Sequence, residues 1–144
     1  MAYMSQERKK ELAPGIKAVL KKYGVKGSIG VRNHSHLVVN ITEGPIDFRQ
    51  QWLSEEPPEY YRPEKHAEWY DYLKRQIDNG GLSINTYHIE RNWEGECQKF
   101  LLELHEAMNG GNHDDSDIMT DYFNVGWYTD INIGKWEKPY KLTV

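Results

Sequence analysis

A regular apolar stripe near residue 100 is the feature that most restricts how this chain can fold. The stripe repeats at intervals of three and four residues, and Asn109, Gly110 and Gly111 follow it directly. Such spacing places side chains on one face of a helix, and glycine after the last turn is typical of a helix end. We therefore predict a helix that buries one face. Its apolar residues are Cys97, Phe100, Leu101, Leu104 and Met108.

Two earlier segments show the same helical spacing. The first ends at Gly24, and Pro14 either opens its first turn or kinks a longer helix that begins near Ser5. The second stops at the Asp-Asn-Gly-Gly run that begins at residue 78. The stripes consist of Leu12, Ile16, Val19, Leu20 and Tyr23 in the first segment, and of His66, Trp69, Tyr70, Leu73 and Ile77 in the second.

The remaining apolar segments alternate with period two, as strands do. Residues 28–32 and 37–41 flank Asn33, His34 and Ser35 and predict a β-hairpin, while residues 82–90 and 123–133 predict two more strands. Three prolines make the stretch from residue 54 to 64 an exposed loop. The order of elements predicts one α+β domain over residues 1–144, with a mostly antiparallel sheet of about four strands covered on one face by about three helices.

Composition and charge limit the environment and the partners. A chain of 144 residues can bury a core without a metal or a disulfide, and Cys97 is its single cysteine. No apolar run is long enough to span a bilayer, so a cytoplasmic protein without a membrane partner is expected. Residues 1–35 hold eight basic and two acidic residues, whereas the remainder holds ten and twenty. The charges of the two parts are therefore +6 and −10, which bears on partners and not on the fold.

Two segments carry a family resemblance: "IKAVLKKYGVKGSIGVRNHSHLVVNITEGPIDF" and "DYFNVGWYTDINIGKWEKPY". Together they resemble an uncharacterised family of small phage-encoded proteins, akin to domains associated with large polyvalent proteins of mobile elements. The likeness covers roughly residues 13 to 48 and 113 to 141. It implies a phage or mobile-element origin and action in the cytoplasm of an infected bacterial host, and it assigns no catalytic residue.

The segment "HDDSDIMTDYF" gathers more candidate metal ligands than any other stretch. Its His113, Asp114, Asp115, Asp117 and Asp121 suit Mg²⁺, Mn²⁺ or Zn²⁺ if they converge, which would favour a metal-dependent hydrolase. The segment lacks the glycine and the distal glutamate of an EF-hand loop. We favour the simpler interpretation that Asp114, Asp115 or Ser116 caps a short helix and that the remaining polar side chains are solvated.

Other chemistry finds little support in the sequence. The segment "GVKGSIG" lacks the G-x-G-x-x-G spacing and the P-loop lysine, so no cofactor is expected. His34 and His36 could face one side of a strand edge, but two ligands do not make a metal site. Cys97 lies on the apolar face of a predicted helix, where a thiol behaves as a small hydrophobe.

Two candidate binding surfaces remain. A basic face could meet phosphates, although no helix-turn-helix, zinc-finger or RNA-reading motif accompanies it. An aromatic group in and near the proline-rich loop, formed by Trp52, Tyr60 and Tyr61, has the composition that protein interfaces favour. We therefore expect a non-catalytic accessory protein that binds a host protein, with nucleic-acid binding as the main alternative. The basic face consists of Lys10, Lys17, Lys21, Lys22, Lys26 and Arg32.

Overall fold

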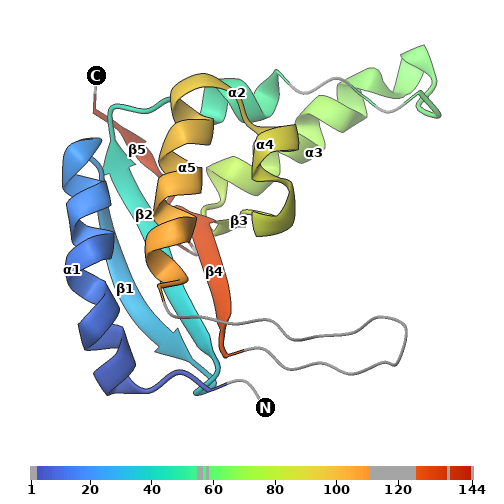
Figure 1. The fold of residues 1–144 in the computed structure, drawn as a ribbon. Coiled ribbons are helices and arrows are strands. Elements are labelled where there is room, and N and C mark those ends of the chain that lie inside the picture. The colour runs from blue at the N-terminus through green and yellow to red at the C-terminus, as the bar shows by residue number, and fades with distance from the viewer. Residues whose placement is uncertain (1–2, 55–56, 58, 111–125, 136, 144) are drawn as a thin grey trace, which may run out of the picture.

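A computed structural model describes residues 3–54, 57, 59–110, 126–135 and 137–143 of the protein. A mixed five-stranded sheet lies at its centre, and α1 and α5 pack side by side on one face of it (Figure 1). The predicted α+β class is confirmed. In chain order the elements are α1 (Gln6–Lys22), β1 (Lys26–Arg32), β2 (His36–Gly44), α2 (Phe48–Leu53), η1 (Pro63–Lys65), α3 (His66–Asp78), β3 (Leu82–Ser83), η2 (Thr86–His88), α4 (Ile89–Asn92), α5 (Gly95–Met108), β4 (Tyr128–Ile133) and β5 (Lys141–Leu142).

Helix α1 is the longer of the two alternatives that the sequence left open. The side chain of Ser5 caps it by accepting a hydrogen bond from the Arg8 backbone N–H at 3.0 Å. Pro14 lies inside the helix, and Gly24 follows it with a φ of 68°. That left-handed conformation favours glycine, so the predicted end of the helix is confirmed.

The predicted hairpin of β1 and β2 is also confirmed. The two strands pair antiparallel, with Arg32 opposite His36 and Ile29 opposite Val39. Asn33 has a φ of 53° and His34 a φ of 56° at the turn between them. Two successive left-handed residues are what a tight hairpin turn needs to match the twist of its strands.

The sheet is mixed and not mostly antiparallel. Its strand order is β1-β2-β4-β3, with β5 paired to the end of β2. β1 and β3 pair antiparallel with their neighbours, whereas the central pair of β2 and β4 is parallel. A parallel pair requires a long crossover, and the segment from α2 to α5 provides it.

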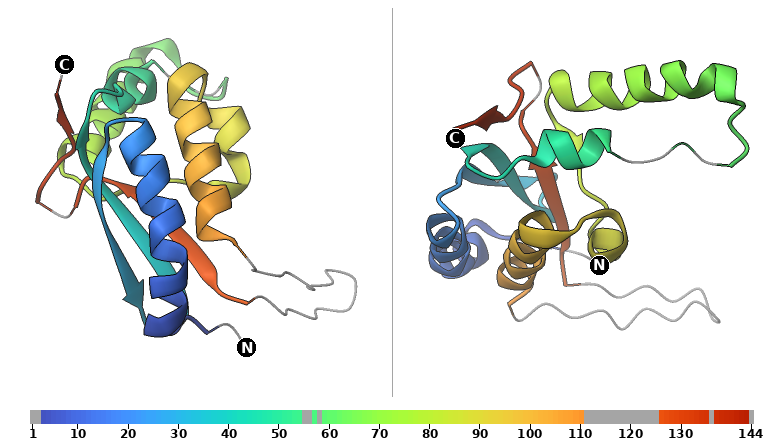
Figure 2. Two further views of the ribbon diagram at one scale, coloured as in Figure 1. Left: turned by 60° about the vertical axis from the view of Figure 1, so that its left-hand side comes forward. Right: turned by 90° about the horizontal axis from the view of Figure 1, so that it is seen from above.

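Period-two alternation determines which side chains of the sheet enter the core. Leu37, Val39 and Ile41 of β2 point to the same face as Ile131 and Ile133 of β4, and all five are fully buried. Figure 2 shows α1 and α5 lying over this face. The helices contribute the other half of the core, including Ile16, Leu20, Phe100, Leu101 and Leu104.

Two of the predicted strands differ from the structure. Residues 82–90 form a strand only at Leu82 and Ser83, and the chain then enters η2 and α4. β4 begins at Tyr128, and residues 123–125 of its predicted range lie outside the described residues. Within the described ranges, no helix is long and apolar enough to cross a membrane.

Candidate functional site

Helix α3 stands out because the core holds only its C-terminal half. Leu73 and Ile77 are buried, and the Trp52 indole N–H donates to the Leu73 carbonyl at 3.0 Å. Near the last turn, the Arg49 guanidinium lies 2.8 Å from the Asp78 carboxylate. The N-terminal half of α3 and the segment that leads into it project from the body of the protein (Figures 1 and 2).

Four aromatic rings lie in contact along this projecting end. The ring centroids of Tyr60 and Tyr61 are 5.3 Å apart, those of Tyr61 and Trp69 5.3 Å, and those of Trp69 and Tyr72 6.3 Å. Tyr60 is 82% exposed and Tyr72 is 47% exposed, whereas Tyr61 and Trp69 are half-buried. We call Tyr60, Tyr61, Trp69 and Tyr72 the aromatic cluster.

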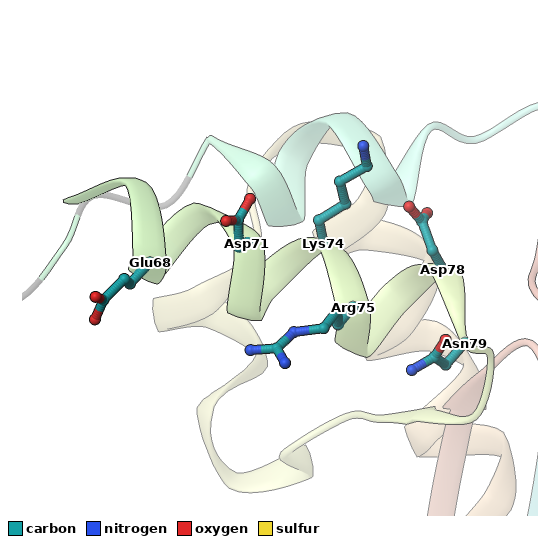
Figure 3. A pocket seen from close by; sticks show the side chains of 6 residues that line it. All are labelled: Glu68, Asp71, Lys74, Arg75, Asp78 and Asn79. Carbon is teal, nitrogen blue, oxygen red and sulfur yellow. The ribbon is translucent and has the colours of Figure 1, made fainter. Parts of the chain in front are cut away.

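A shallow hollow of about 650 Å³ runs along α3 beside the cluster. Figure 3 shows that Asp71 and Lys74 point to one side of the helix, while Glu68 and Arg75 point to the other. The hydrogen bond from Arg49 holds the pKa of Asp78 below its usual value, so this carboxylate is charged at neutral pH. The hollow therefore offers both signs of charge on the flank of the aromatic cluster, without convergence on one point. Its lining residues are Glu68, Asp71, Lys74, Arg75, Asp78 and Asn79.

The structure separates the three residues predicted to bind protein. Tyr60 and Tyr61 belong to the aromatic cluster. Trp52 is half-buried, stacks on Trp93 with ring centroids 6.0 Å apart, and supports the base of α3. Trp69 and Tyr72 were missed because helical spacing assigned Trp69 to the buried stripe and gave Tyr72 no role. Their spacing of three residues, which brings side chains together on a helix, was the available signal.

The predicted basic face is partly neutralised by ion pairs. Lys22 lies 2.6 Å from Glu103, Lys26 3.7 Å from Glu43, and Arg32 2.6 Å from Asp130. Three of the six residues thus already contact a carboxylate. In the part of the chain that the structure describes, the exposed Lys10, Lys17 and Lys21 on α1 have no such partner.

The predicted metal ligands His113, Asp114, Asp115, Asp117 and Asp121 lie outside the described residues. Among the residues that are described, no group of three or more His, Cys, Asp and Glu side chains is arranged to hold a metal ion. His34 is exposed at the hairpin turn, while the Nδ1 atom of His36 lies 2.7 Å from the Ser35 hydroxyl and its ring contacts Tyr128.

The thiol of Cys97 is a core group, as the sequence predicted. Cys97 is buried on α5, and burial raises the pKa of its thiol to about 11. At neutral pH it is therefore protonated, and a protonated thiol is a weak nucleophile.

The sequence and the structure were compared with known proteins. No protein-family model, curated protein or solved structure matches the chain.

Proposed function

We propose that this protein is a non-catalytic binding module of phage or mobile-element origin, and that it binds a host protein through the aromatic cluster on α3. The observation that carries this proposal is the set of four contiguous rings at the projecting end of a helix, with Tyr60 82% exposed. The proposed origin rests on the expected resemblance of residues 13 to 48 and 113 to 141 to phage-encoded proteins.

The physical reason is the amount of apolar area that tyrosine and tryptophan offer at a small cost in entropy. These residues are enriched at interfaces and among the side chains that dominate binding energy. The charged hollow beside the cluster has the polar character of an interface rim. A partner that fits this surface has an apolar pocket for the rings, bordered by charges of both signs.

Nucleic-acid binding, the main alternative, has less support. Phosphate binding gains from cations that are free to replace counterions, and carboxylates already engage Lys22, Lys26 and Arg32. The hydrolase alternative depends on residues 113–121, which the structure does not describe.

The proposal is tested with a double variant, Tyr60→Ser with Tyr72→Ser, and with a matched control, Tyr87→Ser. Tyr87 is 85% exposed on η2, so its substitution removes a tyrosine that is about as exposed as Tyr60 but lies outside the cluster. Immobilised wild-type protein is incubated with a panel of bacterial lysates, and proteins retained above bare resin are identified by mass spectrometry and then purified for calorimetry.

We expect the double variant to weaken binding of the purified partner by at least about tenfold, since aromatic hot spots contribute on the order of 2 kcal/mol each. The Tyr87→Ser protein should bind as the wild type does. Equal affinity for all three proteins would show that the aromatic cluster is not the docking surface. If no lysate yields a retained protein, the binding role itself is contradicted.

A further inference from the structure

Strand β1 forms the outer edge of the sheet. It pairs with β2 on one side, and no strand in the described ranges pairs with the other side. None of its seven residues is buried. Because backbone groups point alternately to the two sides of a strand, every second residue of β1 directs its N–H and C=O away from the sheet, where an added strand would bond to them.

The centre of β1 lacks the features that keep most exposed edges from pairing. Proteins protect such edges with prolines, with bulges or with charges along the strand. Residues 28–31 of β1 are Ser28, Ile29, Gly30 and Val31, which carry no charge and no proline. The one irregularity in the register of β1 lies between Lys26 and Gly27. The edge from Gly27 to Arg32 is therefore regular and free to accept another strand.

A positively charged side chain lies at each end of this edge. Lys26 and Arg32 are the first and last residues of β1, and their side chains are 77% and 56% exposed. Each contacts one carboxylate, so these two cations are partly neutralised. Additional charge that is not neutralised in this way comes from α1, which packs on β1.

A lysine stripe on α1 faces the same side as the free edge. Lys22 bonds to Glu103 on α5, which marks the side of α1 that faces α5. At 100° per residue, Lys21 lies about 100° around the helix from Lys22. In the same sense of rotation, Lys10 lies about 120° and Lys17 about 140° from Lys22. Since α5 contacts β4 and α1 contacts β1, the side of α1 away from α5 borders the outer edge of β1. Lys10, Lys17 and Lys21 form this lysine stripe.

The charges decide which strand suits the edge. In a second copy of the chain paired antiparallel about Ile29, Lys26 would face Arg32 of the other copy, and like charges directly opposite are destabilising. A nucleic acid would meet the lysines but would leave the outward backbone groups of β1 without strand partners. An acidic peptide can form strand hydrogen bonds with the outward backbone groups of β1 and can also place carboxylates near the lysines.

We infer that the outer edge of β1 binds an extended, acidic peptide segment of a partner protein as a sixth strand of the sheet. Successive side chains of a strand alternate between faces, so every second residue of the peptide lies on the side of α1. Acidic residues at these alternate positions meet the lysine stripe. This surface is separate from the aromatic cluster and does not depend on it.

The test uses a fluorescent peptide of about eight residues, the length of a common strand, with alternating Glu and Val. Binding to the full-length protein is measured by fluorescence anisotropy at low salt. Two matched probes accompany it: a peptide with Lys in place of Glu, and the Glu–Val peptide with N-methyl groups on alternate backbone amides. The methyl groups remove strand hydrogen bonds and leave the charges unchanged.

On the protein side, Lys17→Glu with Lys21→Glu is compared with Lys99→Glu with Lys138→Glu. All four lysines are exposed, and the two double variants carry the same net charge. We expect the first pair to weaken binding of the Glu–Val peptide by at least about tenfold and the second pair by much less, because nearby charges dominate. The peptide should shift backbone amide NMR signals of β1.

Three results would overturn the inference. The first is absence of Glu–Val peptide binding while wild-type protein remains folded. The second is equal binding of the N-methylated peptide, which would leave only charge attraction. The third is that single-stranded DNA of random sequence binds in place of the peptide and is lost in the Lys17→Glu, Lys21→Glu protein, which would assign the lysine stripe to nucleic acid.

Discussion

At the scale of single residues, Phe48 is the centre of the aromatic part of the core. It is fully buried, and its ring centroid lies 5.8 Å from that of Trp93, 5.9 Å from that of Phe100 and 5.1 Å from that of Tyr140. These contacts join α2, α5 and the C-terminal segment. Phe48 begins α2, which contacts α3, so it helps to position the base of the region that carries α3.

We predict that Phe48→Ala lowers the free energy of unfolding by about 3–5 kcal/mol, because it removes buried area and leaves a cavity. Urea denaturation followed by circular dichroism measures this loss. Tyr87→Ala is the control, since an exposed side chain usually changes stability by less than about 0.5 kcal/mol. A loss below about 1 kcal/mol for Phe48→Ala would contradict the packing described for this residue.

Single residues also show where the sequence is ambiguous. Trp52 and Tyr60 both lie near the proline-rich loop and have the composition of an interface. Burial separates them, because Trp52 packs on Trp93 while Tyr60 stays exposed. Contacts with residues more than 20 positions away decide this difference, and local composition carries no information about such contacts.

At the scale of elements, the periodicity of apolar residues predicted which helices and strands exist better than it predicted the direction in which paired strands run. The stripe at residues 97–108 became α5, and alternation at residues 28–41 became the hairpin. Alternation does not show whether β2 and β4 run parallel, since both directions bury every second side chain. It also failed at residues 82–90, where only Leu82 and Ser83 form a strand and Ile89 begins α4, with Trp93 buried four residues later.

The cap of α1 yields a prediction at this scale. Ser5→Ala removes the hydroxyl that accepts from the Arg8 N–H, and we expect the free energy of unfolding to fall by about 1 kcal/mol. Chemical denaturation of the wild type and of Ser5→Ala, compared with Ser5→Asp, measures the change. Because aspartate also caps helices, Ser5→Asp should retain wild-type stability; equal losses for both variants would argue against capping.

At the scale of the whole molecule, the fold reduces the charge asymmetry along the chain. The basic first part meets the acidic remainder through Lys22–Glu103 and Arg32–Asp130, pairs that are distant in sequence. The sequence showed the +6 and −10 division but not these pairs. Of the six residues of the predicted basic face, these ion pairs leave the three of the lysine stripe without a carboxylate partner in the described ranges, so the whole fold, and not the helix alone, defines the basic surface.

His105 makes the stability of the whole molecule depend on pH. Burial lowers the pKa of its imidazole, whose Nε2 atom lies 3.2 Å from the Thr129 hydroxyl. As pH falls, the unfolded chain therefore takes up a proton on His105 before the folded chain does. The stability that neutral His105 contributes is complete above the usual pKa of about 6.5 and is lost as pH falls toward the lower pKa of the folded protein. In the His105→Gln variant, the free energy of unfolding should depend less steeply on pH over this range.

Urea midpoints of wild type and His105→Gln across this range, from pH 7.5 down to about 5, measure the effect. As pH falls, the urea midpoint of the variant should rise relative to that of the wild type. Parallel curves would mean that His105 titrates alike in the folded and unfolded chains.

The aromatic cluster is the surface through which we propose that the protein binds its partner. Site-specific photo-crosslinking in bacteria tests this proposal most directly, with p-benzoylphenylalanine in place of Tyr60 or, as the exposed control, in place of Tyr87. A discrete protein adduct from position 60 that is absent from position 87 is the predicted result. Irradiation that yields the same adducts from both positions, or none from position 60, would contradict the account.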